Sequence, residues 1–425
     1  MSTTEAHTAA APLGADAVVI GGSVAGLVMA RSLSAYFERV TILERDALVG
    51  PDEFRPGTPQ ARHAHTLLPE GQAVFEQLFP GLTDELVAHG AVRVDPVTEM
   101  AVCINGVWRA PKNREAGQRV NFSRPLLESV LRRRLSAYPN VVFLASQEVM
   151  GLRTDAGFAR ATGVRLRRRG ALGDGVEEFP ADLVVDASGR GSQAPRWLTD
   201  LGYTPPGETV FTTHTGYATR LYRRPAGFDE SWKILYQRPR PPADTRGGLI
   251  LPVEGDRWLV TLIGVARDYP PADVAGFEAF ARQLPPRFYA ALQAAEPLDE
   301  PFGYQLTESR RRHFEVLPRW PENFLVCGDA VMTLNPVYAL GMTAAALGSL
   351  TLDDSLRQQR QGRLSARDLA RHFQVQLAEV TAPLWEKVTR EDRSWPMMET
   401  RTSGPAPRAS QSLALTPAEA AGAAM

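Results

Sequence analysis

The sequence predicts an α/β fold: a Rossmann-like domain with a parallel sheet, an inserted antiparallel β-sheet, and helices toward the C-terminal end. Three observations lead to this prediction. One strand–glycine–helix–strand unit begins at Asp16, a second glycine-rich strand–turn–helix begins at Phe324, and the stretch from Phe211 to Val265 has almost only β-type patterns. Because the two glycine-rich units lie far apart in the chain, we expect the parallel sheet to be assembled from separated segments.

The first unit has the layout of a dinucleotide-binding βαβ motif. An apolar run ending at Ile20 precedes the turn Gly21-Gly22-Ser23-Val24-Ala25-Gly26, and a helical pattern follows. Glycines at such a turn let the backbone approach a pyrophosphate at the helix N-terminus. Ser23 stands at the second glycine of G-x-G-x-x-G, so the motif is imperfect. Glu44 ends the second strand 18 residues after Gly26 (44 − 26), where a carboxylate that binds an adenosine ribose is expected. The alternative is an ordinary strand–turn–helix without a ligand.

The second unit joins a carboxylate to a helix start. The buried-type strand Phe324 to Cys327 leads into Gly328-Asp329, an Asn335-Pro336 turn follows, and Gly341-Met342 opens a helix. A carboxylate at a strand end can accept hydrogen bonds from a ribityl chain. The helix N-terminus offers free N–H groups to an anionic ring, such as the pyrimidine part of a reduced flavin.

Composition limits the classes of function. The formal net charge of −1 gives no global attraction to nucleic acid or to an anionic membrane. Cys103 and Cys327 support neither a disulfide framework nor a zinc site. The first 15 residues lack the features of a secretory signal, and no run of about 18 apolar residues is present. We expect a cytoplasmic protein without an integral membrane segment.

Four ordered motifs carry a family likeness. They are the N-terminal glycines, Gly57-Thr58-Pro59-Gln60-Ala61-Arg62-His63-Ala64-His65, Val184-Val185-Asp186-Ala187-Ser188-Gly189-Arg190-Gly191-Ser192, and Gly328-Asp329 through Gly341-Met342. With them, the sequence resembles the class A flavoprotein monooxygenases of the p-hydroxybenzoate hydroxylase fold. Within that class it looks most like the bacterial polyene epoxidases of polyether antibiotic pathways, which are relatives of squalene epoxidase.

The resemblance implies a set of residues that hold FAD. The residues are Gly21, Gly22, Ser23, Ala25, Gly26, Glu44, Arg45, Arg62, Arg124, Val149, Asp329, Pro336, Gly341 and Met342. Arg124 would reach the cofactor from its helix start, and Val149 would pack near the adenine. Two departures from the family pattern stand out. Ala339 and Leu340 replace a usual glycine and polar residue, and Ser188-Gly189 replaces the Asp-Gly pair of the ring hydroxylases, with Asp186 earlier.

The order of the patterns along the chain indicates how it is divided. FAD-binding segments are expected at 15–80, 120–200 and 306–355, substrate-domain strands at 81–119, a β-sheet substrate domain at 201–305, C-terminal helices at 356–395, and a disordered tail at 396–425. Ser123 is the expected N-cap of the helix that follows it. A later amphipathic helix is expected over 365–390, with one apolar face formed by Leu369, Phe373, Leu377, Val380 and Leu384.

The expected chemistry is oxygen insertion. NADPH or NADH would reduce the flavin, O2 would form a C4a-hydroperoxide, and its terminal oxygen would epoxidise an alkene of a small hydrophobic polyketide or terpenoid precursor. No catalytic side chain is predicted, because an isolated alkene needs no general base. Hydroxylation of an aromatic ring and a flavin-dependent reductase or dehydrogenase remain alternatives, and a separate flavin reductase as electron donor stays open. The Trp-x-Trp-x-Ile-Pro segment of flavin halogenases is absent at Ser231-Trp232-Lys233-Ile234-Leu235.

Two groups of residues are open to a functional or a structural interpretation. The aromatic residues of the β-type stretch, namely Phe211, Tyr217, Tyr222, Trp232, Tyr236 and Trp258, would line an apolar pocket or fill an ordinary core. His63 and His65 invite a metal site, but no Cys, Asp or Glu stands at ligand spacing. A loop beside the cofactor is the better interpretation of the two histidines.

Overall fold

The computed structural model describes residues 11–110, 117–170, 175–305 and 307–406. Its centre is a five-stranded parallel sheet in the order β20-β11-β1-β2-β7. The strands are β1 (Gly14–Ile20), β2 (Phe37–Glu44), β7 (Val141–Ala145), β11 (Leu183–Asp186) and β20 (Phe324–Val326). Val18 and Val19 of β1 are fully buried, as expected for the middle strand of a sheet that is covered on both faces. The α/β fold and the assembly of the sheet from distant segments are confirmed.

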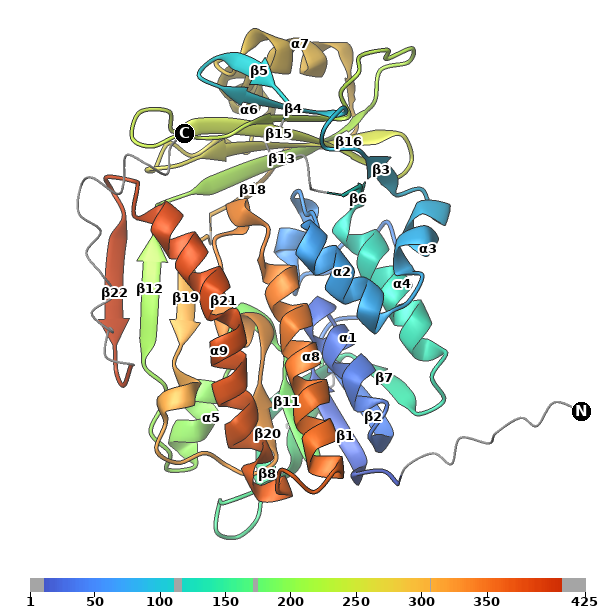
Figure 1. Cartoon of the computed structure of the whole chain (residues 1–425), viewed down its shortest axis with the longest axis vertical. Coiled ribbons are helices and arrows are strands. Elements are labelled where there is room, and N and C mark those ends of the chain that lie inside the picture. Colours follow the sequence, from blue (N-terminus) through green and yellow to red (C-terminus); the bar gives the residue numbers. More distant parts are fainter. Residues whose placement is uncertain (1–10, 111–116, 171–174, 306, 407–425) are drawn as a thin grey trace, which may run out of the picture.

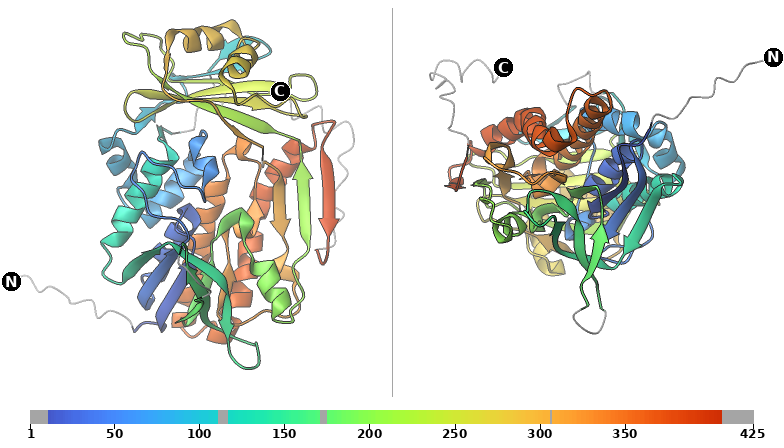
Figure 2. Two further views of the ribbon diagram at one scale, coloured as in Figure 1. Left: turned by 180° about the vertical axis from the view of Figure 1, so that it is seen from behind. Right: turned by 90° about the horizontal axis from the view of Figure 1, so that it is seen from below.

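Helices cover one face of this sheet and a small antiparallel sheet lies on the other (Figures 1 and 2). The covering helices are α1 (Val24–Leu33), α8 (Gly341–Arg360) and α9 (Ala366–Asp392), and the small sheet contains β8 (Gln147–Thr154), β9 (Ala161–Arg168) and β10 (Glu177–Pro180). At the flank lie α2 (Pro69–Leu78), α3 (Leu82–Ala88) and α4 (Arg124–Ser136). The Ser123 N-cap of α4 is confirmed, since its Oγ accepts from the Leu126 N–H at 3.3 Å. No helix in the described part of the chain is both long and apolar enough to cross a membrane.

The predicted apolar face of α9 is correct except at Val380. Leu369, Phe373, Leu377 and Leu384 are buried, whereas Val380 is 37% exposed. In that part of the helix the buried face has turned toward Ala378 and Thr381.

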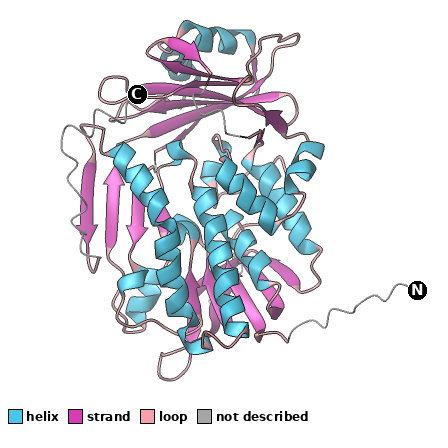
Figure 3. Ribbon diagram, in the orientation of Figure 1, coloured by secondary structure: helices cyan, strands magenta, loops and turns pink. Residues whose placement is uncertain are grey.

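A larger, mostly antiparallel sheet, in which β4 and β14 pair in parallel, lies across the carboxyl end of the parallel one (Figures 1 and 3). Its strands are β4 (Met100–Ile104), β5 (Val107–Arg109), β13 (Gly216–Arg223), β14 (Ile234–Gln237), β15 (Arg246–Val253), β16 (Arg257–Gly264), β17 (Glu296–Pro297) and β18 (Phe302–Tyr304). Within it β15 and β16 form a hairpin, with Val253 opposite Arg257. One face of the sheet packs on α6 (Val274–Ala281) and α7 (Pro286–Ala294), in a core with Leu235, Ile250 and Val260. Because side chains alternate along a strand, Tyr217, Thr219 and Thr261 lie on the opposite face, which we call the inner face.

A four-stranded sheet contradicts one expectation. It contains β12 (Glu208–Thr212), β19 (Ser309–Arg312), β21 (Met332–Thr333) and β22 (Glu399–Ser403). The β-type stretch that begins at Phe211 therefore starts in this sheet and continues in the larger one, because the chain turns at His214, where φ is +49°. The expectation of a disordered tail from residue 396 is wrong at β22, because this segment forms a strand that pairs with the free edge of β12. All five β22 residues are exposed, so no apolar pattern marks the strand; residues 407–425 lie outside the described part.

The remaining elements are short. A two-stranded sheet pairs β3 (Val92–Val94) with β6 (Arg119–Asn121), and α5 (Ala194–Asp200) follows β11. The 3₁₀ turns are η1 (Pro59–Arg62), η2 (Gly189–Gly191), η3 (Phe314–Val316), η4 (Gly328–Ala330) and η5 (Pro336–Tyr338).

Candidate functional site

Three glycine-rich turns meet at the carboxyl ends of β1, β11 and β20. Gly21 has a φ of +104°, and a Cβ added to it would lie 2.7 Å from the Ala187 carbonyl oxygen. A Cβ on Gly26 would lie 1.8 Å from the Gly21 oxygen, and one on Gly328 would lie 2.8 Å from Ala25 Cβ. These approaches leave no room for side chains, so the glycines are required by the packing of the turns on one another. The carboxyl ends of such strands are where this class of sheet binds ligands.

Asp329 lies beside the N-terminus of α8. A Cβ on Gly341 would be 3.9 Å from Asp329 Oδ1, so the carboxylate and the first turn of α8 share one place. Burial raises the pKa of Asp329, and Arg124, Arg190 and Arg310 act in the opposite direction. The structure brings together the strand-end carboxylate and the helix start, and their role in holding a cofactor stays a prediction.

The loop between Asp329 and α8 keeps a glycine-like conformation without a glycine. Ala339 has φ +54° and ψ +34°, in the left-handed region where an L-residue costs about 1 kcal/mol. Asn335 caps η5, with its Oδ1 accepting from the Val337 N–H at 3.3 Å. The substitution at Ala339 therefore adds strain to the loop while its path is retained.

Glu44 lies at the other end of the first glycine turn and is buried. Its Oε2 accepts from the Gly22 N–H at 2.8 Å and lies 2.7 Å from Arg55 Nη1, and its Oε1 accepts from the Asp46 N–H at 2.9 Å. A carboxylate has about four acceptor positions, so about one remains for a ribose hydroxyl.

A buried charge cluster extends from Glu44 to α4, and we call it the Glu128 cluster. Glu128 accepts from Arg55 Nη2 at 2.6 Å, from Arg124 Nε at 2.9 Å and from Ser23 Oγ at 2.6 Å, and Arg132 lies 3.8 Å away. Burial would raise the pKa of Glu128, but Arg124, Arg55 and the Ser23 hydrogen bond lower it to about 2. The Ser23 hydroxyl, which departs from the glycine pattern, is therefore used within the cluster.

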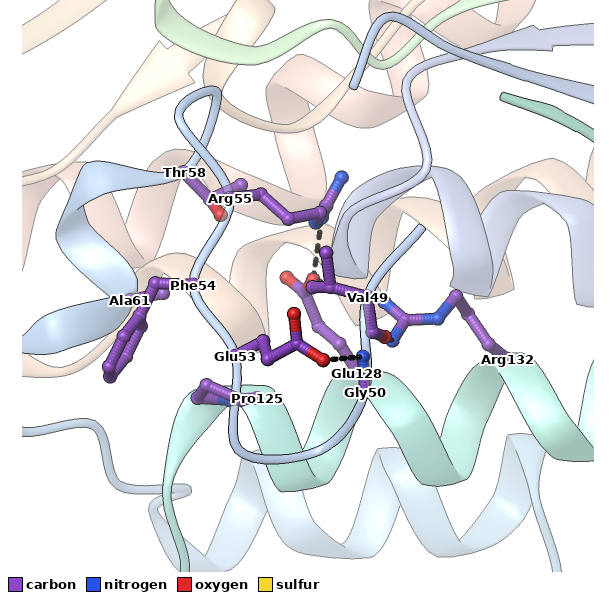
Figure 4. A pocket seen from close by; sticks show the side chains of 10 residues that line it. All are labelled: Val49, Gly50, Glu53, Phe54, Arg55, Thr58, Ala61, Pro125, Glu128 and Arg132. Atoms are coloured by element: carbon purple, nitrogen blue, oxygen red, sulfur yellow. Dashed lines mark hydrogen bonds and ion pairs between the residues drawn. The ribbon is translucent and has the colours of Figure 1, made fainter. Parts of the chain in front are cut away.

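The segment before η1 closes over this cluster (Figure 4). Arg55 points from that segment toward Glu128 on α4, and the cavity left between them has a volume of about 10 Å³. That space holds about one water molecule. Sequence reasoning missed Arg55 and Glu128, although the spacing of Arg124, Glu128 and Arg132 by four residues on one helix is a signal for an ion-paired face.

Other predicted site residues lie outside these contacts. Arg45 is exposed, with its Nε 3.0 Å from where a Cβ on Gly57 would be, and Arg62 is exposed, stacked over Phe54 at 4.4 Å. Val149 lies on β8 and packs against the main core. Met342 is buried in the first turn of α8, and Pro336 begins η5.

Asp186, in the third motif, has a local role. Its carboxylate is fully buried and accepts from the Ser188 N–H at 2.9 Å and the Ser192 hydroxyl at 2.6 Å. Both oxygens thus shape the turn that follows β11.

The structure separates the aromatic residues of the β-type stretch into groups. Tyr222, Trp232 and Trp258 fill the core under α6 and α7, which matches the structural interpretation. Phe211 packs edge-on against Trp385. Tyr217 and Tyr236 belong instead to a cluster that includes Val337, next to η5. Only these two of the six thus lie by the loop that leads to α8.

A polar network lies under the same loop. Asp392, at the end of α9, accepts from the Tyr338 hydroxyl at 2.8 Å and from Asn335 Nδ2 at 3.3 Å, and Asn335 Oδ1 accepts from the Tyr217 hydroxyl at 3.3 Å. Burial raises the pKa of Asp392 to about 6, against its hydrogen bonds from Tyr338, Asn335 and Ser309. The network connects α9, the loop and the inner face of the large sheet.

The two histidines of the second motif do not form a metal site. His63 Nδ1 lies 2.7 Å from Thr219 Oγ1, and His65 Nδ1 donates to the His63 carbonyl oxygen at 2.9 Å. Within the described ranges, no group of three or more His, Cys, Asp or Glu side chains could hold a metal ion.

The chain has relatives of known sequence and of known structure. It is 35% identical over 381 residues to "Protein Rv3254" of Mycobacterium tuberculosis (strain ATCC 25618 / H37Rv), a match that covers 87% of this chain and 78% of that protein. No protein-family model matches the chain.

Solved structures show the same fold at low identity. The myxobacterial chondrochloren halogenase CndH, an FAD-dependent halogenase, superimposes with a TM-score of 0.66 at 17% identity over 89% of this chain and 83% of that one. PqsL of Pseudomonas aeruginosa, a probable FAD-dependent monooxygenase, gives 0.58 at 18% identity over 89% and 94%. A flavoprotein/dehydrogenase from Cytophaga hutchinsonii gives 0.63 at 16% identity over 88% and 85%. The fold is therefore that of FAD-dependent halogenases and monooxygenases.

Proposed function

The chain belongs to the same protein family as Protein Rv3254, and we propose that it is an FAD-dependent monooxygenase that uses NADPH or NADH as reductant and epoxidises an alkene in an apolar specialised-metabolite precursor. The observation that carries the proposal is the position of Asp329 against the N-terminus of α8, where three glycine turns cross beneath the large sheet. A carboxylate that accepts from hydroxyl groups, beside a helix N-terminus whose N–H groups donate to an anionic group, is the pair of partners that a flavin dinucleotide needs.

The described residues offer suitable partners for each part of FAD, from the adenosine end to the flavin ring. Gly21 and Gly26 leave the α1 N-terminus open to a pyrophosphate. Arg124 brings positive charge to the same turn, because its Nη2 donates to Ser23 Oγ at 3.0 Å. Glu44 keeps one acceptor position for the adenosine ribose, as counted above. Asp329 would bind the ribityl chain, and the N–H groups of Gly341 and Met342 would hold the pyrimidine edge of the ring. When bound and reduced, FAD supplies the activation of O2, and the protein positions the substrate and excludes water.

The groups near the loop favour an alkene over a phenol. A phenol needs a base that removes its proton, whereas an alkene does not. Burial, followed by His65 and Arg62, lowers the pKa of His63 to about 3, which makes it a weak base at neutral pH. Burial also raises the pKa of Tyr217 well above its usual value, so its hydroxyl stays neutral. The inner face thus offers neutral groups and rings to a substrate.

Aromatic hydroxylation is the second candidate, and one observation favours it. Asp392, with a pKa of about 6, lies in the network under the loop that also contains the Tyr217 hydroxyl, and a carboxylate with that pKa can act as the base for a ring hydroxyl near neutral pH. Halogenation, known for the neighbour CndH, is less favoured because the Trp-x-Trp-x-Ile-Pro segment is absent. A flavin-dependent reductase or dehydrogenase would not consume O2 in step with product.

Mass spectrometry of products formed under ¹⁸O2 tests the proposal. The purified protein with FAD and NADPH, with and without an added flavin reductase, is given a panel of polyenes and phenols. An epoxide carrying one labelled oxygen is the expected result, and the comparison of the two reactions shows whether a separate reductase is needed. Labelled hydroxylation of phenols alone would establish the second candidate. Flavin reduction and reoxidation with no labelled product from either class would contradict oxygen insertion.

A further inference from the structure

One histidine of the second motif faces the inner side of the large sheet. His63 follows η1 and is 6% exposed, and its ring is surrounded by Tyr217, Phe302 and Tyr304, at centroid distances of 6.1, 5.6 and 5.3 Å. Tyr217 and Tyr304 are directly paired across β13 and β18. We call this arrangement the histidine box.

The histidine box adjoins the loop assigned to the flavin ring. The Tyr217 hydroxyl donates to Asn335 Oδ1, and Asn335 is the residue before Pro336. A substrate that lies between this loop and the inner face would therefore contact the box.

A chain of hydrogen-bonding groups reaches the His63 ring. The Ala64 N–H donates to Thr261 Oγ1 at 3.4 Å, Thr261 Oγ1 lies 2.8 Å from Thr219 Oγ1, and Thr219 Oγ1 lies 2.7 Å from His63 Nδ1. Among the described residues, Thr219 is the acceptor available to the Thr261 hydroxyl. When the Thr261 hydroxyl donates to Thr219, the Thr219 hydrogen points to His63 Nδ1, which accepts it, and the ring proton is on Nε2.

In this tautomer the Nε2–H group is a buried donor without an acceptor. Within the described part of the chain, no hydrogen-bond partner reaches His63 Nε2. Leaving a buried donor unpaired costs about 1–3 kcal/mol, and an aromatic ring is only a weak acceptor. Because the ring is neutral and enclosed by aromatic groups, the acceptor that suits it is a neutral oxygen on an apolar molecule.

We propose that His63 is a substrate-binding residue whose Nε2–H donates to a carbonyl, ester or ether oxygen of an apolar alkene substrate. That the reacting group is an alkene rests on the proposed function. That the substrate carries an oxygen atom as hydrogen-bond acceptor rests on the histidine box alone. The expected substrate is therefore a polyene that carries an oxygen atom, and a plain hydrocarbon is not expected to bind as well. His63 fixes the position of the alkene by holding this oxygen, and Thr219 positions the His63 ring.

The first experiment measures the tautomer directly. The seven histidines are labelled with ¹⁵N, and the signals of His63 are assigned by their loss in His63→Gln. The expected result is a neutral ring at pH 7 with its proton on Nε2, and a change of that tautomer in Thr219→Val. A proton on Nδ1, or a charged ring at pH 7, would overturn the proposal whether or not flavin binds.

The second experiment measures specificity with two probes of equal shape. Geranylacetone, a dienyl ketone, and the hydrocarbon of the same carbon skeleton are titrated into the FAD-loaded protein and into His63→Leu, and binding is followed by flavin absorbance. One hydrogen bond predicts that the ketone binds about tenfold more tightly to the wild type. The preference should fall to about one in His63→Leu, with the flavin content of both proteins measured separately.

The outcomes separate the two proposals. Equal binding of the two probes by the wild type, which a trapped water on Nε2 would give, overturns the role of His63. A preference that survives in His63→Leu, or no binding of either probe, also overturns it. Failure of the protein to take up FAD would contradict the proposed function instead, and the tautomer of His63 could still be measured in that case.

Discussion

Replacement of Glu128 by glutamine tests whether the buried cluster stabilises the fold through its charge. Glu128→Gln keeps the shape of the side chain and leaves Arg55 and Arg124 without their carboxylate. The pKa of Glu128 falls from its ordinary value of 4.5 to about 2 on folding. At 1.36 kcal/mol for each pH unit, that difference corresponds to about 3 kcal/mol of stability. Loss of one partner of a buried ion pair costs roughly the same, about 3–5 kcal/mol.

The sign of the pH dependence follows from the lowered pKa. The stabilisation is complete above pH 4.5 and is lost as the pH falls toward about 2. Urea unfolding of wild type and Glu128→Gln between pH 2 and pH 7 should therefore give free energies of unfolding that converge toward pH 2 and differ by about 3 kcal/mol at neutral pH. Flavin content is matched in both samples, because bound ligand adds to apparent stability.

A surface glutamate provides the control. Glu178 lies in β10, is paired with Arg153 of β8, and has a side chain that is 63% exposed. Glu178→Gln makes the same change of charge as Glu128→Gln. It should cost less than about 1 kcal/mol. If Glu128→Gln unfolds within the error of Glu178→Gln at pH 7, the cluster does not stabilise the fold through its charge and the reasoning is refuted.

Two further predictions concern the crossing of the turns and the polar network. The pKa of Asp392 is raised from 3.8 to about 6, so its ionisation destabilises the folded state as the pH rises through that window. In urea unfolding, Asp392→Asn should therefore be up to about 3 kcal/mol more stable than wild type at pH 8 and equal to it at pH 4. A variant that is less stable than wild type at pH 8 would show that the charge is needed. Gly26→Ala places a Cβ 1.8 Å from the Gly21 oxygen and should lower the melting temperature and abolish flavin uptake, whereas Gly191→Ala, which meets nothing within 4 Å, should behave as wild type. Equal melting temperatures for the two alanine variants would contradict the close crossing of the turns.

The sequence predicts the parallel-sheet half of the fold because its signals are local. Apolar strands that end in glycines, and a helix with a serine N-cap, are set by backbone geometry within a few residues. The same is true of Asp329 and Gly341, whose spacing of a dozen residues is enough to place a carboxylate beside a helix start. These parts could be predicted without knowledge of the rest of the chain.

The parts that sequence reasoning missed depend on contacts between distant segments. Arg55 meets Glu128 across 73 residues, and neither side chain has a pattern that names its partner. β22 is exposed along its whole length and forms because β12 offers an open edge. The division of the aromatic residues between the α6–α7 core and the inner face follows from strand register, which a one-residue shift would reverse.

Titration of FAD into Asp329→Ala tests the central claim most directly. The control is Asp354→Ala, which removes an exposed carboxylate further along α8. Wild type and Asp354→Ala should purify yellow or take up FAD, and Asp329→Ala should be colourless, with affinity lowered by at least about tenfold through loss of a charged hydrogen-bond acceptor. Full flavin content in Asp329→Ala, at a melting temperature equal to that of wild type, would contradict the placement of the cofactor between the glycine turns and α8.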